Sequence, residues 1–285
     1  MVEHYLLVFL FFLGVVLGLV GSLAGVGGGV IFTPLMLAFS EIHPDYVRAT
    51  GLAVALTTAS IGGARYLEEG IADVKIGAFF ASLAVVGSTI GALSGIYITS
   101  NLGNTGKALI RLALGLLLIF IVFIMAYRRI DHPPYREDSL AKRLGLCGGY
   151  HDVVLTTRVY YCVQHIAPTA LSIFLIGLMG GMFGLGGGWA VVPALNLIGK
   201  VPLRAAVGIS LVVLAPSSAA ALAIYVNSKA LPIVLVSSIV PGVILGANFG
   251  ARLGAKAKIR VIRLSVLGVM SVAALQLIIR GLAEL

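Results

Sequence analysis

The sequence predicts an all-α polytopic membrane protein built from two inverted repeats, and two observations carry this prediction. The chain of 285 residues is 59% hydrophobic and only 11% charged, whereas soluble globular proteins contain about 25% charged residues. In addition, the segment 18–34 returns as the segment 177–193, without a gap and with eight identical positions. Each repeat is expected to hold one glycine-broken helical segment followed by three transmembrane helices.

Eight apolar segments are candidates for crossing the bilayer, which takes about 20 apolar residues in a helix. The first and the fifth are too long for one span and contain the glycine-rich break. Each of these two is either one bent helix or a helix followed by a re-entrant half-helix. The eight segments are Tyr5–Ser40, Ala49–Ala64, Ile76–Thr99, Ala108–Tyr127, Ala167–Ile198, Ala205–Val226, Leu231–Ala251 and Leu264–Ile279.

The polar stretch near the middle of the chain divides it into three parts. We expect a first membrane repeat at 1–127, a central loop at 128–165 and a second membrane repeat at 166–285. Within the loop, the β-branched and aromatic run at 159–163 predicts a small β-hairpin.

The two cysteines of the chain, Cys147 and Cys162, both lie in this loop. With His151 and His165 they superficially resemble two pairs of zinc ligands. The spacing is irregular, however, and nothing else in the loop supports a metal. The preferred interpretation is ordinary thiols, with no metal site and no cofactor.

Two glycine triplets, one in each repeat, lie on predicted helices at a spacing of four residues. Small residues at this spacing let helix backbones approach closely in lipid. We therefore expect both triplets to form packing seams between helices. The triplets are Gly87, Gly91 and Gly95 in the first repeat, and Gly242, Gly246 and Gly250 in the second.

The distribution of positive charge predicts how the repeats are oriented, because cytoplasmic loops are enriched in Lys and Arg. If segments one and five each crossed once, the 20 basic residues would divide equally between the two sides. If each returns to its own side, one face holds all but five of the 20. This second arrangement predicts a cell-membrane protein with a cytoplasmic central loop and both termini outside. The five basic residues left outside are Arg48, Lys107, Arg111, Lys229 and Arg280.

The two glycine turns are the best candidates for a binding site. Each is followed by an apolar run and a proline, and proline is tolerated in the first turn of a helix. We therefore expect half-helices to begin near residues 32–34 and 191–193. Helix N-termini bind anions through free N–H groups, and a glycine-broken segment in each half points to a transporter site. The alternative interpretation is that the glycines only permit tight packing.

The predicted spans contain no Asp or Glu away from their ends, so a cation substrate is disfavoured. The missing carboxylates favour an anion held by N–H and hydroxyl donors, although such hydroxyls more often bond their own helix. Asn196 and Asn248 are weaker candidates, and Trp189 is either a gate or a packing residue. The candidate substrate-binding residues are Gly27, Gly28, Gly29, Thr33, Pro34, Thr50, Thr57, Thr58, Gly186, Gly187, Gly188, Pro193, Ser210, Ser217 and Ser218.

Acidic groups gather at the predicted segment ends, where solvated loop is the expected environment. They and His43 are what remains to carry a proton if transport is proton-coupled; coupling to another cation and assembly into homo-oligomers stay open. A nucleic-acid partner is excluded, because no basic face with interleaved aromatic residues is visible. The acidic groups are Glu41, Asp45, Glu68, Glu69 and Asp73.

The doubled Gly-x-Gly-Gly-Gly motif followed by proline, in an eight-segment frame, resembles the TauE/SafE family of sulfite and organosulfonate exporters. The similarity covers essentially the whole chain. The family often has Thr-Ser after the first motif, where this chain has Thr50-Gly51, and the second half has Ile209-Ser210. The resemblance implies transport of a small sulfur-containing anion. The motif positions fall on Gly25, Gly27, Gly28, Gly29 and Pro34, and on Gly184, Gly186, Gly187, Gly188 and Pro193.

Together these arguments predict a secondary transporter that moves sulfite, sulfoacetate or another organosulfonate by alternating access. The anion would be held at the repeat interface by turn N–H groups and Thr or Ser hydroxyls. The alternatives are a passive anion channel, an intramembrane enzyme or sensor, and a divalent-metal transporter. The enzyme lacks support, because the spans hold no nucleophile–base pair or metal-ligand set.

Overall fold

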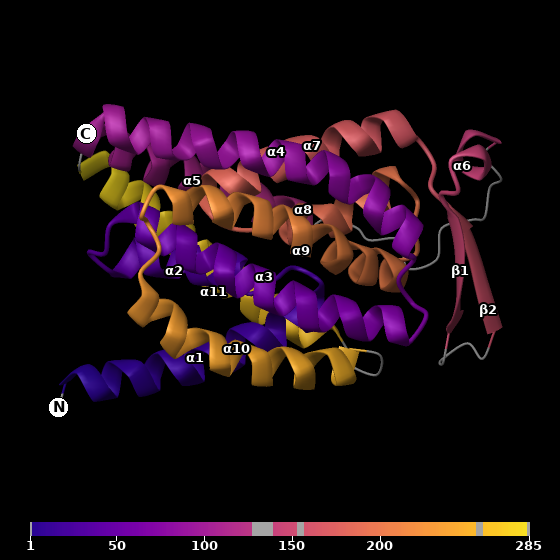
Figure 1. Ribbon diagram of the computed structural model, residues 1–285, viewed down its shortest axis with the longest axis horizontal. Coiled ribbons are helices and arrows are strands. Elements are labelled where there is room, and N and C mark those ends of the chain that lie inside the picture. Colours follow the sequence, from indigo (N-terminus) through magenta and orange to yellow (C-terminus); the bar gives the residue numbers. More distant parts are fainter. Residues whose placement is uncertain (1, 127–138, 153–156, 255–258, 284–285) are drawn as a thin grey trace.

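The computed structural model describes residues 2–126, 139–152, 157–254 and 259–283 (Figure 1). The expected loop residues 127–138 and 153–156, and the basic residues at 256 and 258, lie outside this range. The first half consists of α1 (Val2–Ala24), α2 (Gly29–Phe39), α3 (Pro44–Glu68), α4 (Val74–Asn101) and α5 (Gly103–Ala126). Between the halves lie α6 (Ser139–Arg143), β1 (Cys147–Asp152) and β2 (Thr157–Cys162). The second half consists of α7 (Ile166–Phe183), α8 (Gly188–Pro193), the π-helix η1 (Ala194–Ile198), α9 (Leu203–Asn227), α10 (Ile233–Gly254) and α11 (Ile259–Ala283).

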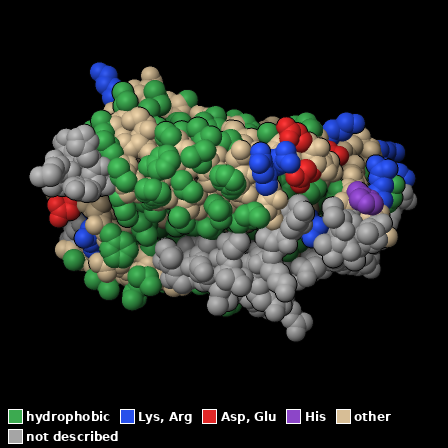
Figure 2. All heavy atoms as spheres, turned by 90° about the horizontal axis from the view of Figure 1, so that it is seen from below, with side chains coloured by type: hydrophobic (Ala, Val, Ile, Leu, Met, Phe, Trp, Pro, Cys, Tyr) green, Lys and Arg blue, Asp and Glu red, His purple; other side chains and the backbone are tan. Residues whose placement is uncertain are grey.

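The helices are those of a membrane protein, as the composition predicts. Within the described residues, six helices are long and apolar enough to cross a bilayer: α1, α4, α5, α7, α9 and α10. The large exposed side chains along these helices are apolar, among them Phe12, Leu93, Phe120, Leu171 and Phe249. The face seen in Figure 2 is apolar over its middle, with most of the charged side chains toward the ends. A surface of this kind is stable only in lipid.

Both glycine-broken segments turn back toward the end of the molecule from which they came (Figure 1). The Gln164 N–H, just before α7, donates to the carbonyl of Gly199, just after η1, at 2.9 Å. At the opposite end, Arg280 of α11 donates to the carbonyl of Ser40, just after α2, at 3.3 Å. Both chain termini lie at this second end. This course is compatible with the two inverted repeats expected from the sequence.

The glycine triplets form packing seams, as predicted, and the seams interlace the two halves. A Cβ placed on Gly91 of α4 would lie 1.9 Å from the carbonyl oxygen of Leu178 on α7. A Cβ placed on Gly246 of α10 would lie 1.9 Å from the carbonyl oxygen of Val15 on α1. Since a Cβ essentially never comes this close to a backbone oxygen, only glycine permits either contact. The third segment of each half is thus packed against the broken segment of the other half.

The central hairpin corrects the interpretation of the cysteines as ordinary thiols. β1 and β2 are antiparallel, with Cys147 opposite Cys162, and the two sulfur atoms form a disulfide. The reason is the strand register, which places two residues 15 apart in the sequence side by side. Disulfide sulfurs are not the thiolates that zinc requires. Among the described residues there is no group of three or more His, Cys, Asp or Glu placed to hold a metal ion.

The hairpin packs against the membrane helices. Tyr150, Tyr161 and Cys162 are buried and belong to the same apolar core as the helices. The Tyr161 ring lies close to the beginning of α4, and burial, followed by the Asp73 carboxylate and Tyr150, raises the pKa of the Tyr161 hydroxyl. The hairpin is therefore a fixed part of the fold.

Candidate functional site

The two glycine turns are built alike and require glycine at the same two positions. Gly25 and its counterpart Gly184 have φ values of 67° and 69°, and Gly27 and Gly186 have values of 78° and 64°. Such left-handed conformations are costly for residues with a Cβ. They end α1 and α7 and let the chain reverse at once into α2 and α8.

The half-helices begin earlier than the prolines suggest, which corrects the expected start at 32–34 and 191–193. α2 begins at Gly29 and α8 at Gly188, directly after the left-handed glycines. Pro34 lies in the interior of α2. Pro193 lies at the end of α8, where the hydrogen bonding changes to the π-helix η1. The N–H groups that lack an acceptor in their own helix are consequently those of the glycines and the residues directly after them.

The two turns contact each other midway along the molecule. A Cβ on Gly188 would lie 2.3 Å from the carbonyl oxygen of Val26 in the other turn. Two hydroxyls from opposite halves also connect to the turns. Thr33 Oγ1 on α2 donates to the carbonyl of Gly184 at 2.8 Å, and Ser210 Oγ on α9 donates to the carbonyl of Gly25 at 2.6 Å. Each turn is thus held by a hydroxyl of the other half, and we call these two bonds the hydroxyl latches.

The latches explain why the first half has Gly51 where the second half has Ser210. A Cβ on Gly51 would lie 1.9 Å from Thr33 Oγ1 and 2.5 Å from the carbonyl oxygen of Gly184. The Thr33 hydroxyl therefore occupies the space that a serine at position 51 would need. The same function is performed from a different helix in each half.

Four of the candidate hydroxyls bond their own helix alone, in line with the common behaviour of Ser and Thr in membrane helices. These four hydroxyls do not contribute to the contact between the turns. The bonds run from Thr50 to Tyr46, from Thr57 to Ala53, from Thr58 to Val54, and from Ser217 to Val213 and Leu214.

The hydroxyl of Ser218 is different from all the other candidates. The residue is 1% exposed, and its Oγ has no hydrogen-bond partner among the described residues. It lies 3.1 Å from the position of a Cβ on Gly186, so it faces the second glycine turn. The indole N–H of Trp189, two residues after Gly187, is likewise buried without a partner in the described part of the chain. An unsatisfied buried donor costs about 1–3 kcal/mol, so the Ser218 hydroxyl that faces the turn indicates a missing acceptor there.

The two asparagines named from the sequence are outside this arrangement. Asn196 is buried, and its amide donates to the carbonyl of Val201 at 2.9 Å, which fixes the return from η1 to α9. Asn248 is exposed on α10. Neither side chain faces the turns.

Sequence reasoning missed a buried charge beside the second turn. Arg48 was counted among the loop residues, but it lies in α3 and is 0% exposed. Its guanidinium donates to the carbonyl of Met182 at 2.9 Å and to Gly95 at 3.3 Å, and it pairs with Asp45. Tyr225 lies 5.4 Å below it and also donates to Met182, at 3.3 Å. Arg48 therefore holds the C-terminal end of α7, where the second turn begins.

The acidic residues at the predicted segment ends have two kinds of environment, one at the surface and one partly buried. Glu68 and Glu69 pair with Arg65 at the surface, and Asp73 accepts the first N–H groups of α4, as is usual for loop residues at helix ends. Asp45 does not fit the solvated environment expected for it, because its side chain is only 14% exposed in the pair with Arg48. The spacing of three residues in one helical turn is the signal that could have revealed this pair.

A helical membrane protein whose two halves meet at paired glycine turns is typical of transporters. Comparison with known proteins agrees. A sequence model of the TauE/SafE sulfite exporter family matches residues 10–277. The chain therefore belongs to the TauE/SafE family. It is a multi-pass membrane transporter and not an enzyme.

Individual relatives carry the same general description. The probable membrane transporter protein YunE of Bacillus subtilis is 26% identical, covering 96% of this chain and 98% of that protein. A probable membrane transporter protein of Methanocaldococcus jannaschii is 26% identical over 93% of this chain and 94% of its own. A TauE/SafE family protein of Arabidopsis thaliana, protein 6, is 32% identical over 26% of this chain and 17% of its own. No solved structure was found to match the chain.

Proposed function

We propose that the protein is a secondary transporter for a small sulfur-containing anion, such as sulfite, sulfoacetate or another organosulfonate. The sulfur chemistry comes from the family, and the anionic character comes from the site. The anion would be held where the two glycine turns meet, at the interface of the halves.

The observation that carries this proposal is the unsatisfied Ser218 Oγ, which faces the second turn. Trp189 Nε1, on the first residue after Gly188, is a second buried donor without a partner among the described residues. Both can donate a hydrogen bond, and an anion accepts several. The first-turn N–H groups of α2 and α8 add further donors and partial positive charge. Within the described ranges no carboxylate is part of this contact, which favours an anion over a cation here.

The hydroxyl latches change what each candidate hydroxyl contributes. A hydroxyl has one proton to donate. That of Thr33 is used on a turn carbonyl, and that of Ser210 is shared between the turn carbonyl of Gly25 and the carbonyl of Val207 in its own helix. Their role in the proposal is to shape the turns, and substrate contact falls to Ser218. The positions that correspond to Ser218 and Trp189 in the first half are Ala59 and Val30. The anion would consequently bind closer to the second turn than to the first.

We propose alternating access for the transport step. The glycine seams bind α4 to α7 and α10 to α1 over many contacts, so each pair would move as one body. The turns are joined across the halves by the two latches, by the bond from Arg48 to the Met182 carbonyl and by close packing contacts. Opening of the anion site to one side of the membrane would then break one of the hydroxyl latches and keep the glycine seams intact.

The first experiment uses proteoliposomes with an imposed proton gradient. Radiolabelled sulfite, sulfoacetate, sulfate and acetate are offered in turn, with cobalt and nickel as cation controls. We expect one sulfur oxyanion to accumulate above its outside concentration. Equilibration without accumulation would indicate a passive anion channel, and transport of the metals alone would overturn the anion site.

Orientation is a separate proposal: the termini face outside and the hairpin faces the cytoplasm. The excess of Lys and Arg on the hairpin side supports it. The disulfide argues for the reverse, because disulfides persist in oxidising compartments. The test uses Arg158→Cys, an exposed position on β2, in a chain with Cys147→Ser and Cys162→Ser. We expect a membrane-impermeant maleimide to label it only after the cells are opened. Labelling in intact cells would reverse the orientation.

A further inference from the structure

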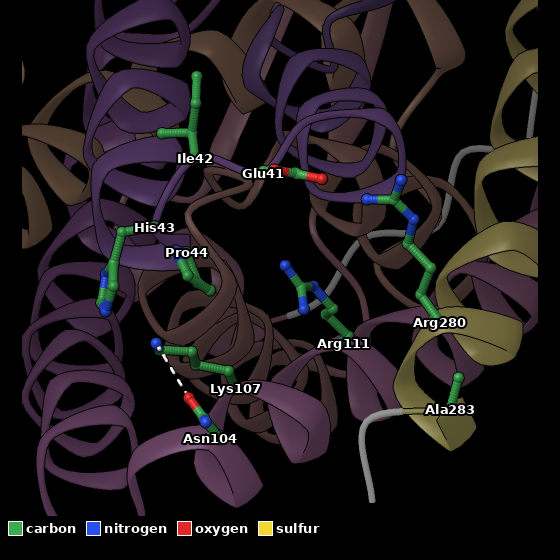
Figure 3. A pocket seen from close by; sticks show the side chains of 9 residues that line it. All are labelled: Glu41, Ile42, His43, Pro44, Asn104, Lys107, Arg111, Arg280 and Ala283. Atoms are coloured by element: carbon green, nitrogen blue, oxygen red, sulfur yellow. Dashed lines mark hydrogen bonds between the residues drawn. The ribbon is translucent and has the colours of Figure 1, made fainter.

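A second concave site lies at the end of the molecule that holds both termini. It is a cavity of about 660 Å³, bounded by the link between α2 and α3, the beginning of α5 and the end of α11 (Figure 3). It is distinct from the glycine turns, which lie midway along the molecule. The polar residues that line it are Glu41, His43, Asn104, Lys107, Arg111 and Arg280.

Three positive charges converge on this cavity. Lys107 and Arg111 are four residues apart on α5 and so share one helix face, and Arg280 approaches from α11 (Figure 3). Arg111 is only 7% exposed, so its charge is poorly screened by solvent. Glu41 is the single carboxylate among the described residues that line the cavity. The lining therefore carries an excess of positive charge.

His43 does not change this balance at neutral pH. Burial lowers the pKa of the His43 imidazole, and the positive charges of Lys107, Arg48 and Arg111 lower it further. Its Nδ1 accepts a hydrogen bond from the N–H of Asp45 at 3.3 Å, as the neutral ring can.

The convergence is unexpected for this end of the molecule. The charge count of the sequence predicts only five of the 20 basic residues on the side that carries the termini, and three of these five line one cavity. A fourth, Arg48, is used inside the fold. The bias that places Lys and Arg on cytoplasmic loops does not explain cations gathered on the opposite side.

We propose that this cavity is a second anion site, which binds a small doubly charged oxyanion through Lys107, Arg111 and Arg280. Guanidinium groups bind sulfonate, sulfate and phosphate oxygens with two parallel hydrogen bonds. The site does not depend on the proposed function of the glycine turns. It is linked to them, however, because Arg280 also donates to the last carbonyl beyond α2, at Ser40, and α2 begins at the first glycine turn. An anion bound here would thus lie beside the contact between the end of α2 and the end of α11.

The same oxyanion chemistry is offered by a free dianion and by the headgroup of an anionic lipid. The experiment titrates sodium sulfate into the purified full chain by calorimetry, at constant ionic strength, in neutral detergent and in nanodiscs. The nanodiscs contain either zwitterionic lipid alone or added phosphatidylglycerol. Competition by the anionic lipid would identify a headgroup as the natural occupant, and its absence would identify the free anion; both support the site.

The variants separate this cavity from the glycine turns. We expect Arg280→Gln and Lys107→Gln each to weaken sulfate binding by roughly tenfold, and Arg280→Lys to retain most of it. Arg252→Gln removes an exposed arginine at the other end and should leave binding unchanged. Weaker sulfate binding in Ser218→Ala, with Arg280→Gln and Lys107→Gln unchanged, would place the sulfate at the second glycine turn instead, since the Ser218 hydroxyl lies there. Sulfate affinity equal to wild type in both Arg280→Gln and Lys107→Gln, with no effect of anionic lipid, would overturn the proposal.

Discussion

Replacement of Ser218 by alanine is expected to weaken substrate binding by about 10- to 100-fold while leaving the ligand-free protein as stable as the wild type or slightly more stable. A hydrogen bond to a charged partner contributes about 1.5–3 kcal/mol, which corresponds to this range. The unusual sign of the stability effect follows from the absence of a partner for Ser218 Oγ in the described structure. Removing an unsatisfied buried hydroxyl removes its desolvation cost. The measurements are initial transport rates across substrate concentrations and thermal unfolding without ligand.

The matched control is Ser217→Ala, one residue earlier in the same helix. Its hydroxyl already bonds the carbonyls of Val213 and Leu214, so its loss should leave the Michaelis constant unchanged. Trp189→Phe removes the second unsatisfied donor and keeps a smaller aromatic ring, and its effect on substrate binding should resemble that of Ser218→Ala. If Ser218→Ala transports normally and unfolds at a lower temperature, the hydroxyl is structural and the substrate site lies elsewhere.

The parts of this fold that sequence predicts are those with a local or repeated signal. The duplication of 18–34 as 177–193 identified both turns, and the spacing of the triplets identified the seams, because a helix face is a property of nearby residues. The re-entrant course of both broken segments also agrees with the charge count. The starts of α2 and α8 were placed too late, since proline was given more weight than the left-handed glycines.

The remaining features depend on contacts between distant residues. The latch from Thr33 to Gly184 joins positions 151 apart, and that from Ser210 to Gly25 joins positions 185 apart. A sequence cannot say which hydroxyl of a helix reaches across and which bonds its own backbone. For the same reason the candidates Thr50, Thr57, Thr58 and Ser217 could not be distinguished from Ser218. Arg48 was assigned to a loop because charge is rare inside a membrane protein.

Arg48 gives the second large effect. Arg48→Met is expected to lower the free energy of unfolding by about 3–5 kcal/mol, because it leaves the Asp45 carboxylate without its partner and frees the Met182 carbonyl. Asp45→Asn should cost a similar amount, since Arg48 is 0% exposed. The double variant should lose clearly less than the sum of the two, because neither charge is then left alone. Thermal unfolding or unfolding in a denaturing detergent measures all three.

The comparison pair lies at the other end of the same helix. Arg65 pairs with Glu68 and Glu69, but its side chain is 42% exposed, so Arg65→Gln should cost no more than about 1 kcal/mol. Arg48→Lys keeps the charge but not the planar fork that contacts Asp45, Gly95 and Met182 together, and it should recover only part of the loss.

Because Arg48 holds the end of α7 beside the second turn, a destabilised variant should also lose the contribution of Ser218 to substrate binding. Additive effects in the Asp45 and Arg48 double variant would show that the two charges act independently.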